Sequence, residues 1–163
     1  MNIWHSTKWK NYYHKHDKCL HRTGLRTLYD CDMNPEVKRA CKEFIVWLRT
    51  QYYFPKRVRL YVKSSRRIRC RLGSDLVCGT FFRPGDRDVE PYIRIATGDY
   101  DELLNNRGQD NALADILWSI AHELTHYFQW VNDIKLTPVG EERQATIYAN
   151  RILDDYASMR DHP

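Results

Sequence analysis

Two histidines and a glutamate fall at a spacing that suits metal chemistry. Residues 120–126 read Ile-Ala-His-Glu-Leu-Thr-His, so His122 and His126 lie four residues apart around Glu123. On a helix this spacing brings both imidazoles to one face, one turn apart. Two such imidazoles can bind one metal ion, most often Zn²⁺, and Glu123 is placed to take a proton from a metal-bound water. The H-E-x-x-H pattern therefore predicts a zinc site that activates water.

This geometry requires a helix, and the residues around the motif favour one. Neither Pro nor Gly interrupts the chain from Asp110 to Asn132, and Asp110 or Asn111 is expected to cap the helix start. Apolar residues keep helical spacing at Ile116, Leu117, Ile120, Leu124, Phe128 and Val131. A buried helix with two ordinary histidines and a solvated Glu123 is the plainer alternative.

A third protein ligand is needed to complete such a site. Gln129 and Asn132 occupy the positions at which metzincins extend the motif with Gly and His, which excludes that class. His162 is the only later histidine, and it lies where chain ends usually fray. A carboxylate downstream of the motif is therefore the better candidate.

Glu142 is the predicted third ligand. Thr137-Pro138 is expected to begin a second helix after a short turn, which suits an antiparallel helix pair. Glu142 shares one stripe of that helix with Ala145 and Ala149, and two alanines permit close approach to the motif helix. Glu141 points about 100° away on the helix and is expected on the flank or in solvent.

These residues together resemble the gluzincin metallopeptidases. The pattern His122-Glu123-x-x-His126 followed by Glu142-x-x-Ala145-x-x-Tyr148-Ala149 is similar to their small single-domain kind, the ImmA/IrrE-like proteins. The resemblance implies one catalytic zinc ion bound by both histidines and Glu142. It also implies an endopeptidase that hydrolyses peptide bonds through a zinc-bound water activated by Glu123. The resemblance is specific over residues 110–155.

The rest of the chain predicts an α+β frame for the two helices. Asn34-Pro35 should open an N-terminal helix that runs to about Tyr53. Residues alternating between apolar and polar predict four strands, at about 57–63, 67–72, 76–83 and 92–96. A loop is expected over residues 98–108. The expected fold is an N-terminal helix, a four-stranded, mostly antiparallel sheet, then the HExxH helix and the Glu-ligand helix, a minimal gluzincin core.

The length of 163 residues suits one domain, and the composition, 42% hydrophobic and 13% aromatic, suits a packed core. We expect residues 34–163 to form a single zincin-like domain and residues 1–33 to form a basic, aromatic N-terminal arm. His14, His16, Cys19, His21 and Cys31 are a weaker candidate for a second, structural metal site. The first residues lack the apolar core of a signal peptide, and no apolar run could span a membrane. A cytoplasmic protein with five free cysteines is therefore expected.

Charge is divided unevenly along the chain. Residues 1–75 carry 18 Lys and Arg against six Asp and Glu, whereas residues 76–163 carry eight against 15. The basic face of residues 57–71 could bind nucleic acid, or the two halves could neutralise each other. The alternative function is thus a nucleic-acid-associated zinc protein or a SprT-like protease that acts on DNA-bound proteins. The SprT-like pattern uses a third histidine, which is absent here, and a purely structural zinc site needs no base at Glu123.

The resemblance also implies how a substrate binds. In this family the strand before the motif helix is an edge that pairs with an extended protein or peptide substrate, and Tyr92–Ala96 takes that position here. A second electrophile is usual, and the candidates are Tyr100, Tyr127 and Tyr148. The ligand histidines should donate their second N–H to a neighbour, for which Asp115 and Asp99 are available.

Overall fold

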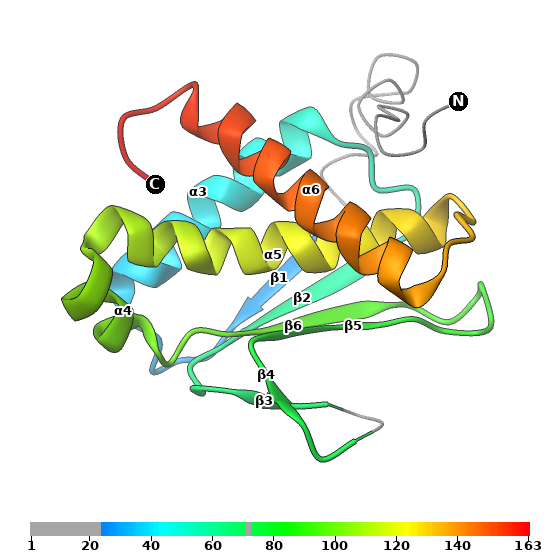
Figure 1. The fold of residues 1–163 in the computed structure, drawn as a ribbon, viewed down its shortest axis with the longest axis horizontal. Coiled ribbons are helices and arrows are strands. Elements are labelled where there is room, and N and C mark those ends of the chain that lie inside the picture. Colours follow the sequence, from blue (N-terminus) through cyan, green and yellow to red (C-terminus); the bar gives the residue numbers. More distant parts are fainter. Residues whose placement is uncertain (1–23, 71–72) are drawn as a thin grey trace.

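A mixed β-sheet with helices packed on one face makes up the frame of the protein (Figure 1). The computed structural model describes residues 24–70 and 73–163. The sheet has the order β1 (Leu25–Tyr29), β2 (Val58–Lys63), β6 (Tyr92–Ala96) and β5 (Gly79–Phe82). A separate hairpin of β3 (Ile68–Arg69) and β4 (Leu76–Val77) lies against the other face. The helices are α3 (Pro35–Gln51), α4 (Tyr100–Arg107), α5 (Gln109–Val131) and α6 (Pro138–Ala157).

The α+β class is confirmed, but the prediction of a mostly antiparallel sheet is wrong. Strand β2 pairs in parallel with both β1 and β6, and only β5 and β6 pair antiparallel. Strand β1 lies within residues 1–33, which we predicted as an arm. Its edge position leaves Leu25 as its one fully buried residue, so the sequence shows no alternation there. The crossover helix α3 between β1 and β2 is what allows these two strands to run parallel.

Several predicted elements are confirmed at their expected places. Asn34 caps α3 by accepting from the backbone N–H of Glu36 at 2.9 Å, and Thr137 caps α6 by accepting from Gly140 at 3.1 Å. The loop predicted over residues 98–108 is wrong, because most of it forms helix α4. Gly108, at φ 79°, separates α4 from α5 and takes the cap position that we predicted for Asp110 or Asn111.

Helix α5 is the centre of the core, buried on several sides between the sheet, α3 and α6. Its apolar residues Leu117, Ile120 and Leu124 are fully or almost fully buried. Helix α6 crosses α5, and its Ala145 and Ala149 have no exposed surface. Small side chains at this contact let the two helices approach closely, which is how a residue of α6 comes within reach of the motif on α5.

Ion pairs join the basic first half of the sequence, residues 1–75, to the acidic second half, residues 76–163. Among the described residues, arginines of 1–75 pair with carboxylates of 76–163 in Arg59–Glu90, Arg66–Glu102 and Arg67–Asp99, whereas Arg83–Glu141 and Arg87–Asp133 lie within residues 76–163. Three of these arginines lie in the basic face of residues 57–71, so part of its charge is neutralised within the molecule. Within the described ranges, no helix combines the length and apolar character that crossing a bilayer needs.

The cysteines of the described ranges carry free thiols. These are Cys31, Cys41, Cys70 and Cys78. Cys19 lies outside the described residues, as do His14, His16 and His21 of the predicted second metal cluster. The prediction of a second metal in that cluster therefore stays a prediction.

Candidate metal centre

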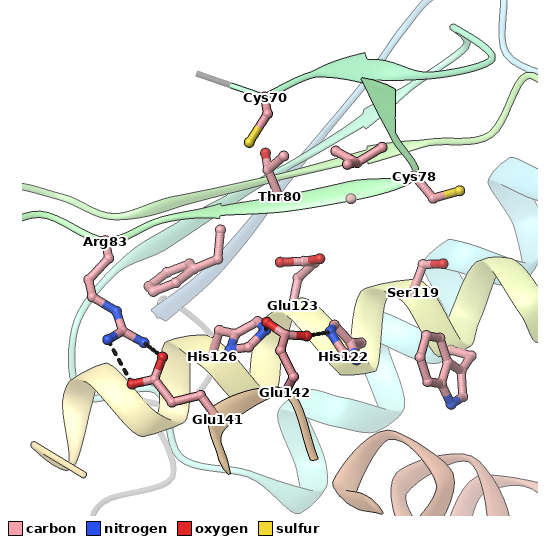
Figure 2. Close-up of a pocket in the computed structure, with 14 residues that line it drawn as sticks. Cys70, Cys78, Thr80, Arg83, Ser119, His122, Glu123, His126, Glu141 and Glu142 are labelled. Atoms are coloured by element: carbon pink, nitrogen blue, oxygen red, sulfur yellow. Dashed lines mark hydrogen bonds and ion pairs between the residues drawn. The ribbon is translucent and has the colours of Figure 1, made fainter. Parts of the chain in front are cut away.

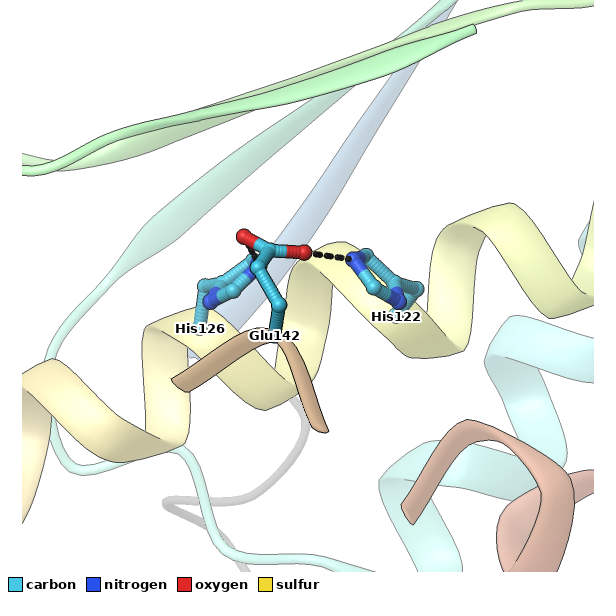
Figure 3. Close-up of side chains that lie close together, drawn as sticks. All are labelled: His122, His126 and Glu142. Carbon is cyan, nitrogen blue, oxygen red and sulfur yellow. Dashed lines mark ion pairs between the residues drawn. The ribbon is translucent and has the colours of Figure 1, made fainter. Parts of the chain in front are cut away.

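The three predicted ligands meet where α6 crosses the middle of α5 (Figure 3). Nε2 of His122 lies 3.2 Å from one carboxylate oxygen of Glu142, and Nε2 of His126 lies 3.3 Å from the other. One potential ligand atom from each of the three residues lies within 4.8 Å of the others. The carboxylate thus reaches both imidazoles from above the helix face that they share.

These distances fit a zinc ion. Ligand atoms about 2.0–2.1 Å from a tetrahedral zinc ion are about 3.3 Å from one another, close to the two observed nitrogen–oxygen distances. Two imidazole nitrogens and a carboxylate oxygen are also a donor set that catalytic zinc sites use, with one position left for water or substrate. The residues present therefore fit the predicted ion.

A buried amide network orients His126. Gln129 has no exposed surface, and its amide nitrogen donates to the backbone carbonyl of Glu141 and to Oε1 of Gln144, both at 3.0 Å. Its amide oxygen must then face Nδ1 of His126, 2.8 Å away, and Nδ1–H is the donor. In the neutral imidazole, Nε2 therefore carries a lone pair and faces Oε1 of Glu142. Two acceptor atoms facing each other in this way are stabilised by a cation between them.

His122 is supported differently. Its ring packs on the indole of Trp118, with centroids 4.9 Å apart, and the indole N–H donates to Asn150 on α6 at 2.8 Å. Nδ1 of His122 is buried and makes no hydrogen bond with any described residue. Burial, followed by the neighbouring His126, lowers the pKa of His122. A lowered pKa favours the neutral imidazole that a metal ion requires.

The supporting residues differ from those we expected. Asp115 forms an ion pair with Arg107, and Asp99 forms one with Arg67, so the structure places neither beside a ligand histidine. Gln129 and Gln144 take this role, and sequence reasoning missed them. The sequence pattern could have pointed to both residues, since each is a polar residue at a core position of its helix. Gln129 also lies about one helical turn after His126.

The two adjacent glutamates of α6 have separate surroundings. Glu142 faces the histidines, although 64% of its side chain remains exposed. Glu141 points to the flank and forms a two-point ion pair with Arg83, at 3.0 and 3.2 Å (Figure 2). This pair joins α6 to the strand end after β5, and nothing in the sequence singled out Arg83 as its partner.

Glu123 points from α5 toward strand β5 and is 9% exposed (Figure 2). Burial, followed by the charge of Glu142, raises the pKa of its carboxyl to about 8. The strand comes so close that a Cβ atom on Gly79 would lie 2.9 Å from Oε1 of Glu123. Glycine at this position is therefore what leaves room for the carboxyl group between helix and strand.

A pocket of about 580 Å³ opens at this point between α5, α6 and β5. Its walls include His122, Glu123, His126, Glu141 and Glu142, together with Gly79, Thr80 and Phe81 of β5. The three candidate tyrosines are absent from its described walls. Tyr100 and Tyr148 are buried elsewhere, and the hydroxyl of Tyr127 donates to the backbone carbonyl of Lys56 at 2.6 Å. The structure therefore brings none of these tyrosines to the metal centre.

The prediction that strand Tyr92–Ala96 is a free edge is wrong. It is β6, and it is hydrogen-bonded to β2 on one side and to β5 on the other. Strand β5 comes just before β6 in the chain and pairs with the side of β6 that faces away from β2. The strand pattern of the sequence does not show which strands pair. Strand β5 is the edge of the sheet beside the pocket.

No similarity to another protein was found that could add to this geometry. What is known of the site rests on its own residues: two histidines and a glutamate at ligand spacing, a buried carboxyl group beside them and a strand edge above. Comparisons with protein family models, with curated proteins and with solved structures found no match for this chain.

Proposed function

We propose that the protein is a zinc-dependent endopeptidase of the gluzincin kind. The observation that carries this proposal is the meeting of His122, His126 and Glu142 with a second carboxyl group, Glu123, in one pocket. A structural metal site is usually closed by four protein ligands, whereas three ligands in an open pocket leave a position for water. Glu123 has no role in holding the ion and is placed to handle a proton.

The roles of the chain's own residues follow from this arrangement. His122, His126 and Glu142 would hold the ion, which when bound supplies a Lewis acid for water and for the substrate carbonyl. Glu123 would accept the proton of the attacking water and return it to the leaving amine. The Gln129 network would keep the His126 lone pair aimed at the ion.

Strand β5 is the element that we propose holds an extended substrate. The backbone carbonyl of Cys78, just before the strand, accepts from the backbone N–H of Ala96 at 2.7 Å. In an antiparallel pair every second residue bonds to the partner strand, so the backbone groups of Thr80 and Phe82 also face β6. The backbone groups of Gly79 and Phe81 then point toward the free edge. A peptide added at this edge would lie beside the metal centre without any requirement for particular side chains.

Glu123→Gln tests the proposal directly. The variant should bind about one zinc ion per chain, as the wild type should, but should not cleave an unfolded protein such as reduced, alkylated casein. The base is lost while all three ligands remain. Zinc content measured by atomic emission and cleavage measured on gels decide the matter. A wild type that binds no zinc at neutral pH, or a variant that cleaves as fast as the wild type, would reject the assigned roles.

The nucleic-acid alternative is less well supported. Arg59, Arg66 and Arg67 of the proposed basic face each pair with a carboxylate of the same molecule. Neutralised arginines contribute little to phosphate binding, which depends on uncompensated positive charge. We therefore make no functional claim for that face.

A further inference from the structure

A second cavity lies on the other face of strand β5. It measures about 450 Å³, and its walls include Cys70, Thr80, Phe82, Tyr92 and Arg94. Thr80 and Phe82 are cross-strand partners of Arg94 and Tyr92, whereas their neighbours Gly79 and Phe81 pair with the buried Ile95 and Ile93. Side chains alternate between the two faces of a strand, so this cavity opens away from α5. Figure 2 shows Thr80 pointing toward Cys70 of the hairpin, on this outer side.

The two cavities meet along the free edge of β5. Cys70, Thr80, Phe81 and Arg83 contribute to the walls of both. A peptide paired with this edge would direct alternate side chains into the metal pocket and toward the outer cavity. Residues opposite Gly79 and Phe81 would face the metal side, and residues opposite Thr80 and Phe82 would face the outer side.

The two cavities differ in charge. The metal pocket is walled by Glu123, Glu141 and Glu142, whereas the described walls of the outer cavity contain arginines and no carboxylate. Arg83 is neutralised by Glu141. Among the described residues, the side-chain contacts of Arg94 are with Thr80 and with the backbone carbonyl of Arg69 and not with a carboxylate, so Arg94 gives the outer cavity a positive charge.

Arg94 is held in place while keeping donors available. Its Nε lies 3.3 Å from Oγ1 of Thr80, and one terminal nitrogen donates to the backbone carbonyl of Arg69 at 3.1 Å. These contacts with described residues use two of the five N–H donors that a guanidinium carries. A guanidinium oriented in this way is suited to bind a carboxylate.

The apolar part of the cavity suits the stem of such a side chain. The rings of Phe82 and Tyr92 stack at 4.8 Å between centroids, with an interplanar angle of 22°, beside Arg94. Methylene groups can pack on these rings while the terminal carboxylate reaches the guanidinium. A glutamate or aspartate side chain therefore matches both the charge and the shape of the site.

We propose that this outer cavity is a substrate subsite for an acidic side chain, with Arg94 as the residue that determines the preference. The proposal rests on the endopeptidase function proposed above and adds a substrate class to it. Acidic residues should be favoured at every second position of the bound substrate, where the side chains face the outer cavity. The positions between them face the metal pocket and carry no such preference.

The test uses the zinc-loaded full chain and a synthetic library of end-capped decapeptides with randomised sequence. Mass spectrometry of the products gives residue frequencies on both sides of each cut. For the wild type we expect Asp and Glu to be enriched about fivefold at one position, or at positions two residues apart, as a partly exposed ion pair allows. Arg94→Gln should remove the enrichment, and Arg94→Glu should replace it with Lys and Arg.

Arg26→Gln is the matched control. Arg26 is exposed and lies on the opposite edge strand, β1. It pairs with Arg59 of β2, which pairs with Tyr92 of β6, so all three lie on the same outer face of the sheet. It should keep the wild-type profile. A wild-type profile without acidic enrichment, or an enrichment that survives in Arg94→Gln, would overturn the subsite while leaving the peptidase in place. No cleavage by the zinc-loaded wild type would overturn the peptidase and the subsite together.

Discussion

The two ends of the candidate metal centre are built by different means, although each contributes one histidine of the same helix. At the His126 end, Gln129 connects the imidazole to Gln144 and to the backbone of α6 through buried hydrogen bonds. At the His122 end, the ring rests on Trp118, and its buried Nδ1 has no described partner. Hydrogen bonds set both the direction and the protonated nitrogen of an imidazole, whereas stacking limits only the position of the ring. We therefore expect the His126 end to contribute more of the site's preorganisation.

The largest effect is expected from removing the group that bridges both ends. Glu142→Ala takes away the carboxylate that faces each imidazole, so zinc affinity should fall by more than the roughly 10–100-fold that loss of a supporting residue costs. Activity should disappear with the zinc. Competition with a chromophoric chelator measures the affinity.

Glu141→Ala is the neighbouring control for this variant. Its side chain pairs with Arg83, and only its backbone carbonyl, which the variant keeps, belongs to the Gln129 network. Its zinc affinity should stay within about twofold of the wild type, because an ion pair of this exposure contributes little. Equal losses in the two variants would mean that Glu142 is not the ligand.

The second prediction separates the two ends. Gln129→Leu removes the acceptor for Nδ1 of His126 and the two buried hydrogen bonds that the amide donates to α6. We expect zinc affinity to fall about 10–100-fold. We also expect the free energy of unfolding of the zinc-free protein to fall by about 1–3 kcal/mol. Chelator competition and urea unfolding in EDTA measure these two effects.

Gln129→Glu serves as the rescue variant. Its carboxylate still accepts from Nδ1–H but cannot donate to Gln144, so it should restore zinc affinity more fully than stability. If Gln129→Leu binds zinc as tightly as the wild type, the network has no part in orienting His126, and the contrast between the two ends fails.

The smallest effect is expected at the other end. Trp118→Phe keeps an aromatic ring against His122 but loses the hydrogen bond from the indole to Asn150. Zinc affinity should change by no more than about threefold, since a single exposed hydrogen bond contributes about 1 kcal/mol or less. The same chelator titration applies. A loss as large as that of Gln129→Leu would show that both ends depend on polar anchoring.

Predictions from short segments agreed with the structure best. The Asn34 and Thr137 caps, strand 92–96 and the helical stripe with Glu142 each depend on a few neighbouring residues, and the structure places all of them as expected. The errors concern residues far apart in the sequence. Strand β1 was missed because an edge strand buries few side chains. Strand β6 was taken for an edge because the sequence pattern does not show that β5 pairs with its outer side.

The sequence alone determined the chemistry of the candidate ligands, because helical periodicity places His122, Glu123 and His126 without reference to the rest of the fold. It also selected Glu142 over Glu141, since neighbouring residues of a helix point in different directions. Only the tertiary structure decided which groups support the ligands and which strand borders the pocket. Gln129, Gln144, Gly79 and Arg94 acquire their surroundings through the packing of α5 against α6 and the pairing of β5 with β6. Such contacts join residues that no local periodicity relates.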